Sequence, residues 1–126
     1  MSNWKTGRKE VVKLNDILLI LEKVSKSDDH KIIIGTDSVK LGYDFIFTKA
    51  ICIMNKEFYD RRYFYCRTKI NDDSYLDLSK RLLKETTDSL DLAIQIRDKL
   101  SQANIEIHAD VNSRKRCSSW IWHIRY

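Results

Sequence analysis

Three β-rich runs joined by two short turns, then one long helical run and one more apolar run, restrict this chain to few topologies. The β-rich runs cover residues 31–39, 43–54 and 58–70. Turns this short join antiparallel neighbours, whereas the long helix expected over 75–100 can cross over to a fourth strand at 105–111. We therefore expect an α/β fold with a mixed sheet, in which the fourth strand runs parallel to the first.

An amphipathic helix is expected before the sheet, at residues 10–25. Its apolar residues follow the i, i+3, i+4 spacing of one buried stripe, and they are Val11, Leu14, Ile17, Leu18, Leu21 and Val24. Residues 112–126 show no regular pattern, so we expect an irregular tail there. A chain of 126 residues suits one domain spanning 1–126.

The composition favours a folded protein with an anionic partner. Hydrophobic residues make up 43% of the chain, and the formal net charge is +5. A cationic excess attracts polyanions, so RNA or DNA is a candidate partner. A modest excess of this size is equally common in proteins that never bind nucleic acid.

The cysteines and the apolar runs indicate where the protein works. Cys52, Cys66 and Cys117 show no paired spacing, so free thiols in a reducing cytoplasm are expected. The longest apolar run, at 17–21, is far shorter than the ~20 residues that a membrane-spanning helix needs. We therefore expect a cytoplasmic protein without a membrane segment.

Three carboxylates carry the functional prediction. Asp37 ends the first strand, Asp110 ends the fourth, and Glu85 lies within the long helix. At about 100° per residue, Glu85 falls in the apolar sector of that helix, beside Leu78 and Ile96. Sites in open α/β sheets gather at the carboxyl ends of parallel strands. We therefore expect the three acids to converge at that end of the sheet.

Converging carboxylates have a natural ligand. They repel one another unless cations lie between them, and oxygen-only clusters suit Mg²⁺ or Mn²⁺. Such a site can activate water for phosphodiester hydrolysis. The residues alone leave an alternative, because a strand-end aspartate often caps a turn and a glutamate at the edge of a helix face often forms a salt bridge.

A family resemblance rests on three short segments. They are Gly-Thr-Asp-Ser at 35–38, Lys-Glu-Thr at 84–86 and Ile-His-Ala-Asp at 107–110. Together they resemble the YkuK family of ribonuclease H-like proteins, over residues 31–119. The resemblance implies a ribonuclease H-like fold and a two-metal, nuclease-type site.

On that resemblance, Asp37, Glu85 and Asp110 are the catalytic residues and the ligands of Mg²⁺ or Mn²⁺. Ribonuclease H-like domains continue after the fourth strand with further helices and a last acidic ligand, but residues 118–126 contain no acid. We therefore expect a C-terminally incomplete, truncated domain. The function is then either metal-dependent nuclease activity, or an inactive remnant that binds nucleic acid or a partner protein.

Two further features carry open alternatives. His108 lies on the same side of its strand as Asp110, and it either contacts substrate or is a hydrogen-bonded structural histidine. Tyr63, Tyr65 and Arg67 alternate along the third strand on a face expected to be exposed. That face either binds nucleic acid or reflects the ordinary preference of tyrosine for strands.

Overall fold

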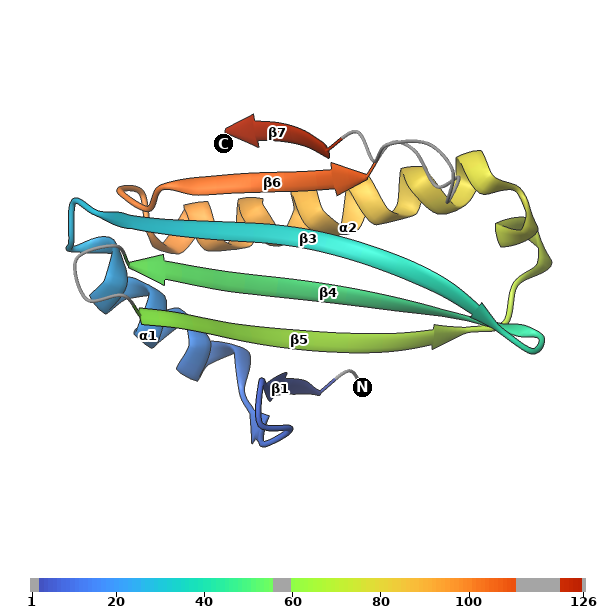
Figure 1. The fold of residues 1–126 in the computed structure, drawn as a ribbon, viewed down its shortest axis with the longest axis horizontal. Coiled ribbons are helices and arrows are strands. Elements are labelled where there is room, and N and C mark those ends of the chain that lie inside the picture. Colours follow the sequence, from blue (N-terminus) through green and yellow to red (C-terminus); the bar gives the residue numbers. More distant parts are fainter. Residues whose placement is uncertain (1–2, 56–59, 111–120, 126) are drawn as a thin grey trace.

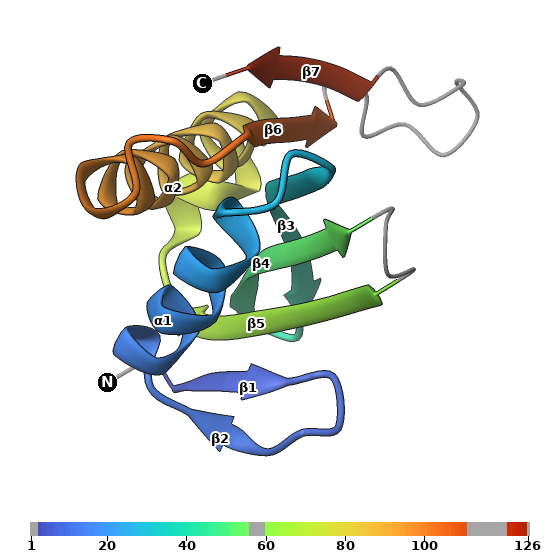
Figure 2. The ribbon, with the colours of Figure 1, turned by 90° about the vertical axis from the view of Figure 1, so that its left-hand side faces the viewer.

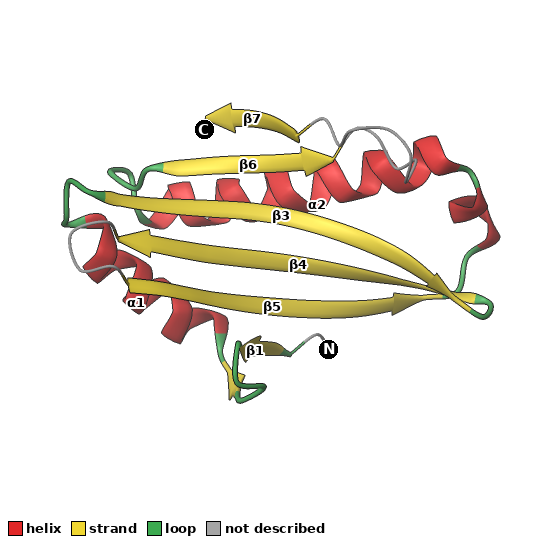
Figure 3. Ribbon diagram, in the orientation of Figure 1, coloured by secondary structure: helices red, strands yellow, loops and turns green. Residues whose placement is uncertain are grey.

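The structure, a computed structural model, describes residues 3–55, 60–110 and 121–125 (Figure 1). The elements in chain order are β1 (Trp4–Thr6), β2 (Val11–Val12), α1 (Leu14–Ser25), β3 (His30–Leu41), β4 (Asp44–Asn55), β5 (Asp60–Ile70), the 3-10 helix η1 (Asp73–Leu76), α2 (Leu78–Lys99), β6 (Ile105–Asp110) and β7 (Ile121–Arg125). Figure 3 colours them by type. The described strands form one seven-stranded sheet in the order β2-β1-β5-β4-β3-β6-β7.

The expected topology is confirmed at the centre of the sheet. β3 and β4 pair antiparallel along their whole length, and β4 pairs antiparallel with β5. α2 then crosses over, and β6 pairs parallel with β3 from Ile32–Ile105 to Gly35–His108. The result is the mixed α/β sheet predicted from the two short turns and the long helix.

The N-terminal region differs from the prediction of a helix over 10–25. Lys9 adopts a positive φ of 68°, which a non-glycine residue adopts mainly in turns, and the chain reverses there. β1 therefore pairs with both β2 and β5, while α1 begins only at Leu14. Val11, predicted on the buried stripe, lies in β2 and is 68% exposed, whereas Trp4 is part of the core.

The C-terminal region also differs from its prediction. β7 pairs antiparallel with β6, from Asp110–Ile121 to Glu106–Arg125, so the region predicted as an irregular tail contains a strand. The other residues of that region, 112–120 and 126, lie outside the described residues, as does residue 111, the predicted end of the fourth strand. The backbone of β7 pairs with the N–H and C=O groups along the outer edge of β6, which would otherwise have no neighbouring strand.

One face of the sheet carries the core, and we call it the helix face. Both helices pack on it (Figure 2). Its fully or nearly fully buried residues include Ile17, Leu21, Ile32, Ile34, Ile51, Ile53, Ile96, Ile105 and Ile107. No described helix covers the opposite face, which we call the open face. Because successive strand residues point to opposite faces, Lys31, Gly35 and Asp37 of β3 belong to the open face.

Candidate functional site

The contact between α2 and β3 changes from apolar to polar towards the carboxyl end of β3. Ile32 and Ile34 are fully buried against the helices, but the next two β3 residues on that face are polar. Thr36 Oγ1 lies 2.7 Å from Ser89 Oγ of α2. Ser38 Oγ donates a hydrogen bond to Glu85 Oε2 at 2.5 Å. The buried side of α2 therefore holds this strand end through hydrogen bonds.

Glu85 lies on the sheet-facing side of α2, as the helical arithmetic predicted, and it is 9% exposed. Arg81, one turn earlier, donates from Nε to Ser38 Oγ at 3.2 Å and from Nη2 to Ser38 O at 3.4 Å. The Arg81 guanidinium also lies 5.5 Å from the centroid of the Phe45 ring. A buried carboxylate needs hydrogen-bond donors or positive charge. The Ser38 hydroxyl donates to Glu85 and accepts from Arg81, so it links the carboxylate to a guanidinium that supplies both.

Asp37 lies between the two β3 residues that α2 holds. Because Thr36 and Ser38 face the helix, the Asp37 side chain points to the open face, where it is exposed. Its Oδ1 accepts a hydrogen bond from the Ser38 N–H at 2.9 Å. Asp37 and Glu85 therefore flank the same strand end from opposite faces, with Ser38 between them.

Only the backbone of Asp110 is described. It is the last residue of β6, two residues beyond His108, just as Asp37 is two residues beyond Gly35, the partner of His108. The Asp110 side chain lies outside the described residues. The convergence of the three acids thus stays a prediction, and within the described part of the chain no group of three or more Asp, Glu, His or Cys side chains could hold a metal ion.

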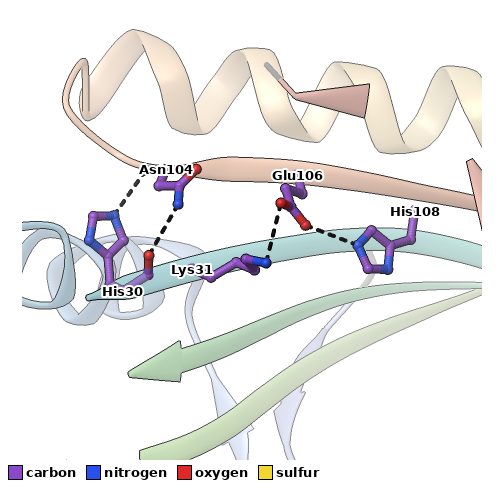
Figure 4. Close-up of polar contacts among 5 residues, drawn as sticks. All are labelled: His30, Lys31, Asn104, Glu106 and His108. Carbon is purple, nitrogen blue, oxygen red and sulfur yellow. Dashed lines mark hydrogen bonds and ion pairs between the residues drawn. The ribbon is translucent and has the colours of Figure 1, made fainter. Parts of the chain in front are cut away.

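A second acid on the open face was not anticipated. Glu106 is only 4% exposed, and Figure 4 shows it between two basic side chains. Lys31 Nζ lies 3.3 Å from Glu106 Oε1, and His108 Nε2 lies 3.3 Å from Glu106 Oε2. His108 is thus a hydrogen-bonded histidine. The available sequence signal for Glu106 was a charged residue in the middle of an apolar strand.

The environment of Glu106 decides its charge. Burial, the largest single influence, would raise the pKa of Glu106. Hydrogen bonds from His108 and Lys31, together with their positive charges, outweigh burial and hold the pKa of this carboxyl below its ordinary value. Glu106 is therefore ionised at neutral pH and ties β3 to β6 on the open face.

A histidine joins two connections at the other end of the sheet (Figure 4). His30 Nδ1 lies 2.5 Å from Ser27 O, and His30 Nε2 lies 2.9 Å from the Asn104 backbone N. Asn104 Nδ2 also donates to His30 O at 3.2 Å. These partners assign the proton to Nδ1 and the acceptor role to Nε2. His30 is thus a neutral structural residue that links the start of β3 to the segment before β6.

Comparison with known proteins agrees with the fold. No described helix has the length and apolar character that a membrane crossing requires. No curated protein matched the chain, and no solved structure matched it either. A family model described as Ribonuclease H-like matches residues 14–124, which include both helices, the three central strands and β6. This chain belongs to the ribonuclease H-like family.

Proposed function

We propose that this protein is a metal-dependent phosphodiester hydrolase that acts on RNA or DNA through Asp37, Glu85 and Asp110. The observation that carries the proposal is the end of β3. Asp37 is exposed there on the open face, and Glu85 contacts the next residue, Ser38. Asp37 and Asp110 each lie two residues beyond the last register pair of β3 and β6, Gly35–His108. Membership of the ribonuclease H-like family supports the reaction class.

The described side chains fit a divalent cation in part. Asp37 offers an exposed carboxylate, the donor type that Mg²⁺ and Mn²⁺ prefer. Glu85 already accepts a hydrogen bond from the Ser38 hydroxyl, which Arg81 also contacts. We therefore propose Asp37 and Asp110, from neighbouring parallel strands, as the primary ligands. Glu85 lies on the helix face of the same strand end and would join them only by reaching round the end of β3. A bound cation would supply Lewis acidity and lower the pKa of a bound water.

The first experiment tests the reaction. Labelled single-stranded RNA and DNA are incubated with increasing Mn²⁺, and the wild type is compared with Asp37→Asn and Asp110→Asn. Loss of an outer-shell partner costs about 10–100-fold, so losing a direct ligand should reduce cleavage by at least about 100-fold. Asp98→Asn, at an exposed position of α2, is the matched control and should retain activity. Equal cleavage by the wild type and Asp37→Asn would end the enzyme proposal.

A second experiment separates two roles for Glu85. Glutamine can still accept the hydrogen bond from Ser38 but carries no charge, so Glu85→Gln tests ligation while preserving the contact. If Glu85 is a ligand, millimolar Mn²⁺ should raise the melting temperature of the wild type clearly more than that of Glu85→Gln, which keeps Asp37 and Asp110, because a ligand that binds only the folded state stabilises it. An equal rise in both proteins would leave Glu85 as a residue that positions the end of β3.

A non-catalytic nucleic-acid-binding domain is the second candidate, and Arg81 is the observation that favours it. Its guanidinium hydrogen-bonds the same Ser38 hydroxyl that binds Glu85, so a positive charge already lies beside this acid without a metal. Binding that weakens with salt and survives loss of all three acids, in a protein without cleavage activity, would support this candidate.

A further inference from the structure

Three side chains of β5 form a stacked row on the open face, which we call the β5 ladder. The rings of Tyr63 and Tyr65 have centroids 6.2 Å apart and are inclined by 29°. The Arg67 guanidinium lies 5.2 Å from the centroid of the Tyr65 ring. The residues between them, Phe64 and Cys66, belong to the core on the helix face. The ladder is therefore anchored by a strand whose other side is buried.

The β1–β2 turn leaves room for the first ring of the ladder. A Cβ atom at Gly7 would lie 2.8 Å from Tyr63 Cε1, so the Tyr63 ring occupies the space that a side chain at this position would take. Tyr63 nevertheless remains 50% exposed. A ring that is held in place yet half exposed can stack on a planar ligand at a small entropic cost.

Basic residues surround the ladder. Lys5 of β1 lies directly opposite Tyr65 in the sheet register, and Lys69 lies one strand repeat beyond Arg67, where it pairs with Asp44 at 3.3 Å. A second copy of this chain docked here would bring these cations towards each other. A polyanion is the partner that complements them.

A cavity lies at the Tyr63 end of the ladder, at the edge of the sheet. It has a volume of about 440 Å³, and its lining includes Arg8, Glu10, Ile20, Arg62, Tyr63 and Phe64. Arg62 lies opposite Ile53 and Phe64 lies opposite Ile51 in the sheet register, and both isoleucines belong to the core on the helix face. The cavity is therefore separate from the open face, although Tyr63 borders both.

Two small residues, Ala50 and Gly35, lie between the β5 ladder and His108 on the open face. Across the sheet, Tyr65 of β5 lies opposite Ala50 of β4, Ala50 lies opposite Gly35 of β3, and Gly35 lies opposite His108 of β6. At about 4.8 Å per strand, the backbone of Gly35 is roughly 10 Å from that of Tyr65. Ala50 and Gly35 raise no bulky side chain between Tyr65 and His108, so an extended chain can cross the sheet there.

We infer that the open face binds a single strand of nucleic acid, with a base stacked on the half-exposed ring of Tyr63 and phosphates held by Arg67 and Lys5. Tyr65 lies between Tyr63 and Arg67 and holds both in place. A single strand exposes its bases for stacking, whereas a duplex keeps them paired and stacked internally. Binding at the ladder needs no metal and does not depend on the proposed hydrolysis. The neighbouring register row runs from Arg67 through Thr48 to Asp37, so a strand bound at the ladder can reach the proposed acids.

The test measures binding in EDTA, where hydrolysis cannot occur. A fluorescein-labelled single-stranded 15-mer of roughly the length that one small domain covers is titrated with protein, as RNA and as DNA, and its anisotropy is followed. Tyr63→Leu and Tyr65→Leu should each weaken binding roughly fivefold or more. Tyr43→Leu, at a position 87% exposed and outside the ladder, is the matched control and should bind like the wild type. Melting temperatures verify that each variant is folded.

Two further arms complete the design. Arg67→Gln should reduce the dependence of log affinity on log salt by about 0.7, the value for one phosphate contact on a single strand. A duplex of the same sequence should bind more weakly than the single strand. Asp98→Asn, at an exposed position of α2, should bind like the wild type. Because the titration is done in EDTA, failure of the proposed hydrolysis leaves this inference standing.

Three results would overturn the inference. The first is equal affinity of folded wild type, Tyr63→Leu and Tyr65→Leu for the single strand. The second is a preference for the duplex. The third is a dimer of the wild type, seen by sedimentation without oligonucleotide, that the same two substitutions abolish, because the open face would then bind a second copy of the chain.

Discussion

Replacing Lys31 by methionine should destabilise the protein by removing a positive charge from beside the buried Glu106. Glu106 is 4% exposed, and its carboxylate contacts Lys31 and His108, each at 3.3 Å. Methionine preserves most of the aliphatic stem of Lys31 but removes the ammonium group. His108 remains, so Glu106 Oε2 keeps its contact with His108, whereas Glu106 Oε1 loses its contact with the Lys31 ammonium.

The size of the effect follows from burial. Removing one partner of a fully buried ion pair costs about 3–5 kcal/mol. The Lys31 side chain is 35% exposed, so water already screens part of the attraction, and we expect about 1–2 kcal/mol for Lys31→Met. In a cycle with Glu106→Gln, which keeps the shape but removes the charge, the double variant should be more stable than the sum of the two single losses implies.

The dependence on pH has a definite sign. The pKa of Glu106 is lowered in the folded protein relative to its ordinary value of 4.5. Its contribution to stability is therefore present above pH 4.5 and is lost as the pH falls through the folded value. In Lys31→Met the pKa of Glu106 should rise, because burial raises it and one opposing group is gone. The stability difference from the wild type should thus be largest at neutral pH and shrink in acid.

Urea unfolding followed by circular dichroism measures these differences. It is repeated from pH 7 down to the lowest pH at which both proteins fold. The reasoning is refuted if Lys31→Met loses the same free energy at every pH, or if the Lys31 and Glu106 substitutions are simply additive.

Three further predictions concern single residues. His30→Ala should lower the free energy of unfolding by about 2 kcal/mol, because the Asn104 N–H and the Ser27 carbonyl lose their hydrogen bonds to His30. An unchanged urea midpoint would contradict the role of His30 in linking the start of β3 to the segment before β6. Gly35→Ala should cost about 1 kcal/mol, since its Cβ would meet His108 O at 3.3 Å, and a midpoint equal to that of the wild type would show that the strands separate easily. Burial raises the pKa of the Cys52 thiol, so peptide-resolved alkylation of Cys52 at pH 8 should be slower than that of a model thiol, and equal rates would refute it.

The topology could be predicted because its signals are local. Short turns require antiparallel neighbours, and a long helix between strands allows a parallel return. The burial of Glu85 was predictable for the same reason, since helical periodicity sets the sheet-facing side of α2 without reference to other elements. The family resemblance, confirmed over residues 14–124, rests on short motifs that need no contact information.

The ends of the sheet could not be predicted because their signals are not local. Val11 fits the periodicity of the following helix, and only the reversal at Lys9 and the pairing of β1 with β5 take it into a strand. β7 likewise owes its conformation to the neighbouring strand β6. Hydrogen bonds between segments distant in the chain outweigh local propensity at both edges.

The sequence alone determined which residues alternate along each strand and which side of α2 carries Glu85. Only the tertiary structure decided that Thr36 and Ser38 bind α2, which turns Asp37 to the open face, and that Glu106 is buried between Lys31 and His108. The physical reason is that alternation is a property of one strand. The face that becomes buried, and the partner that a buried charge finds there, depend on elements brought together from elsewhere in the chain.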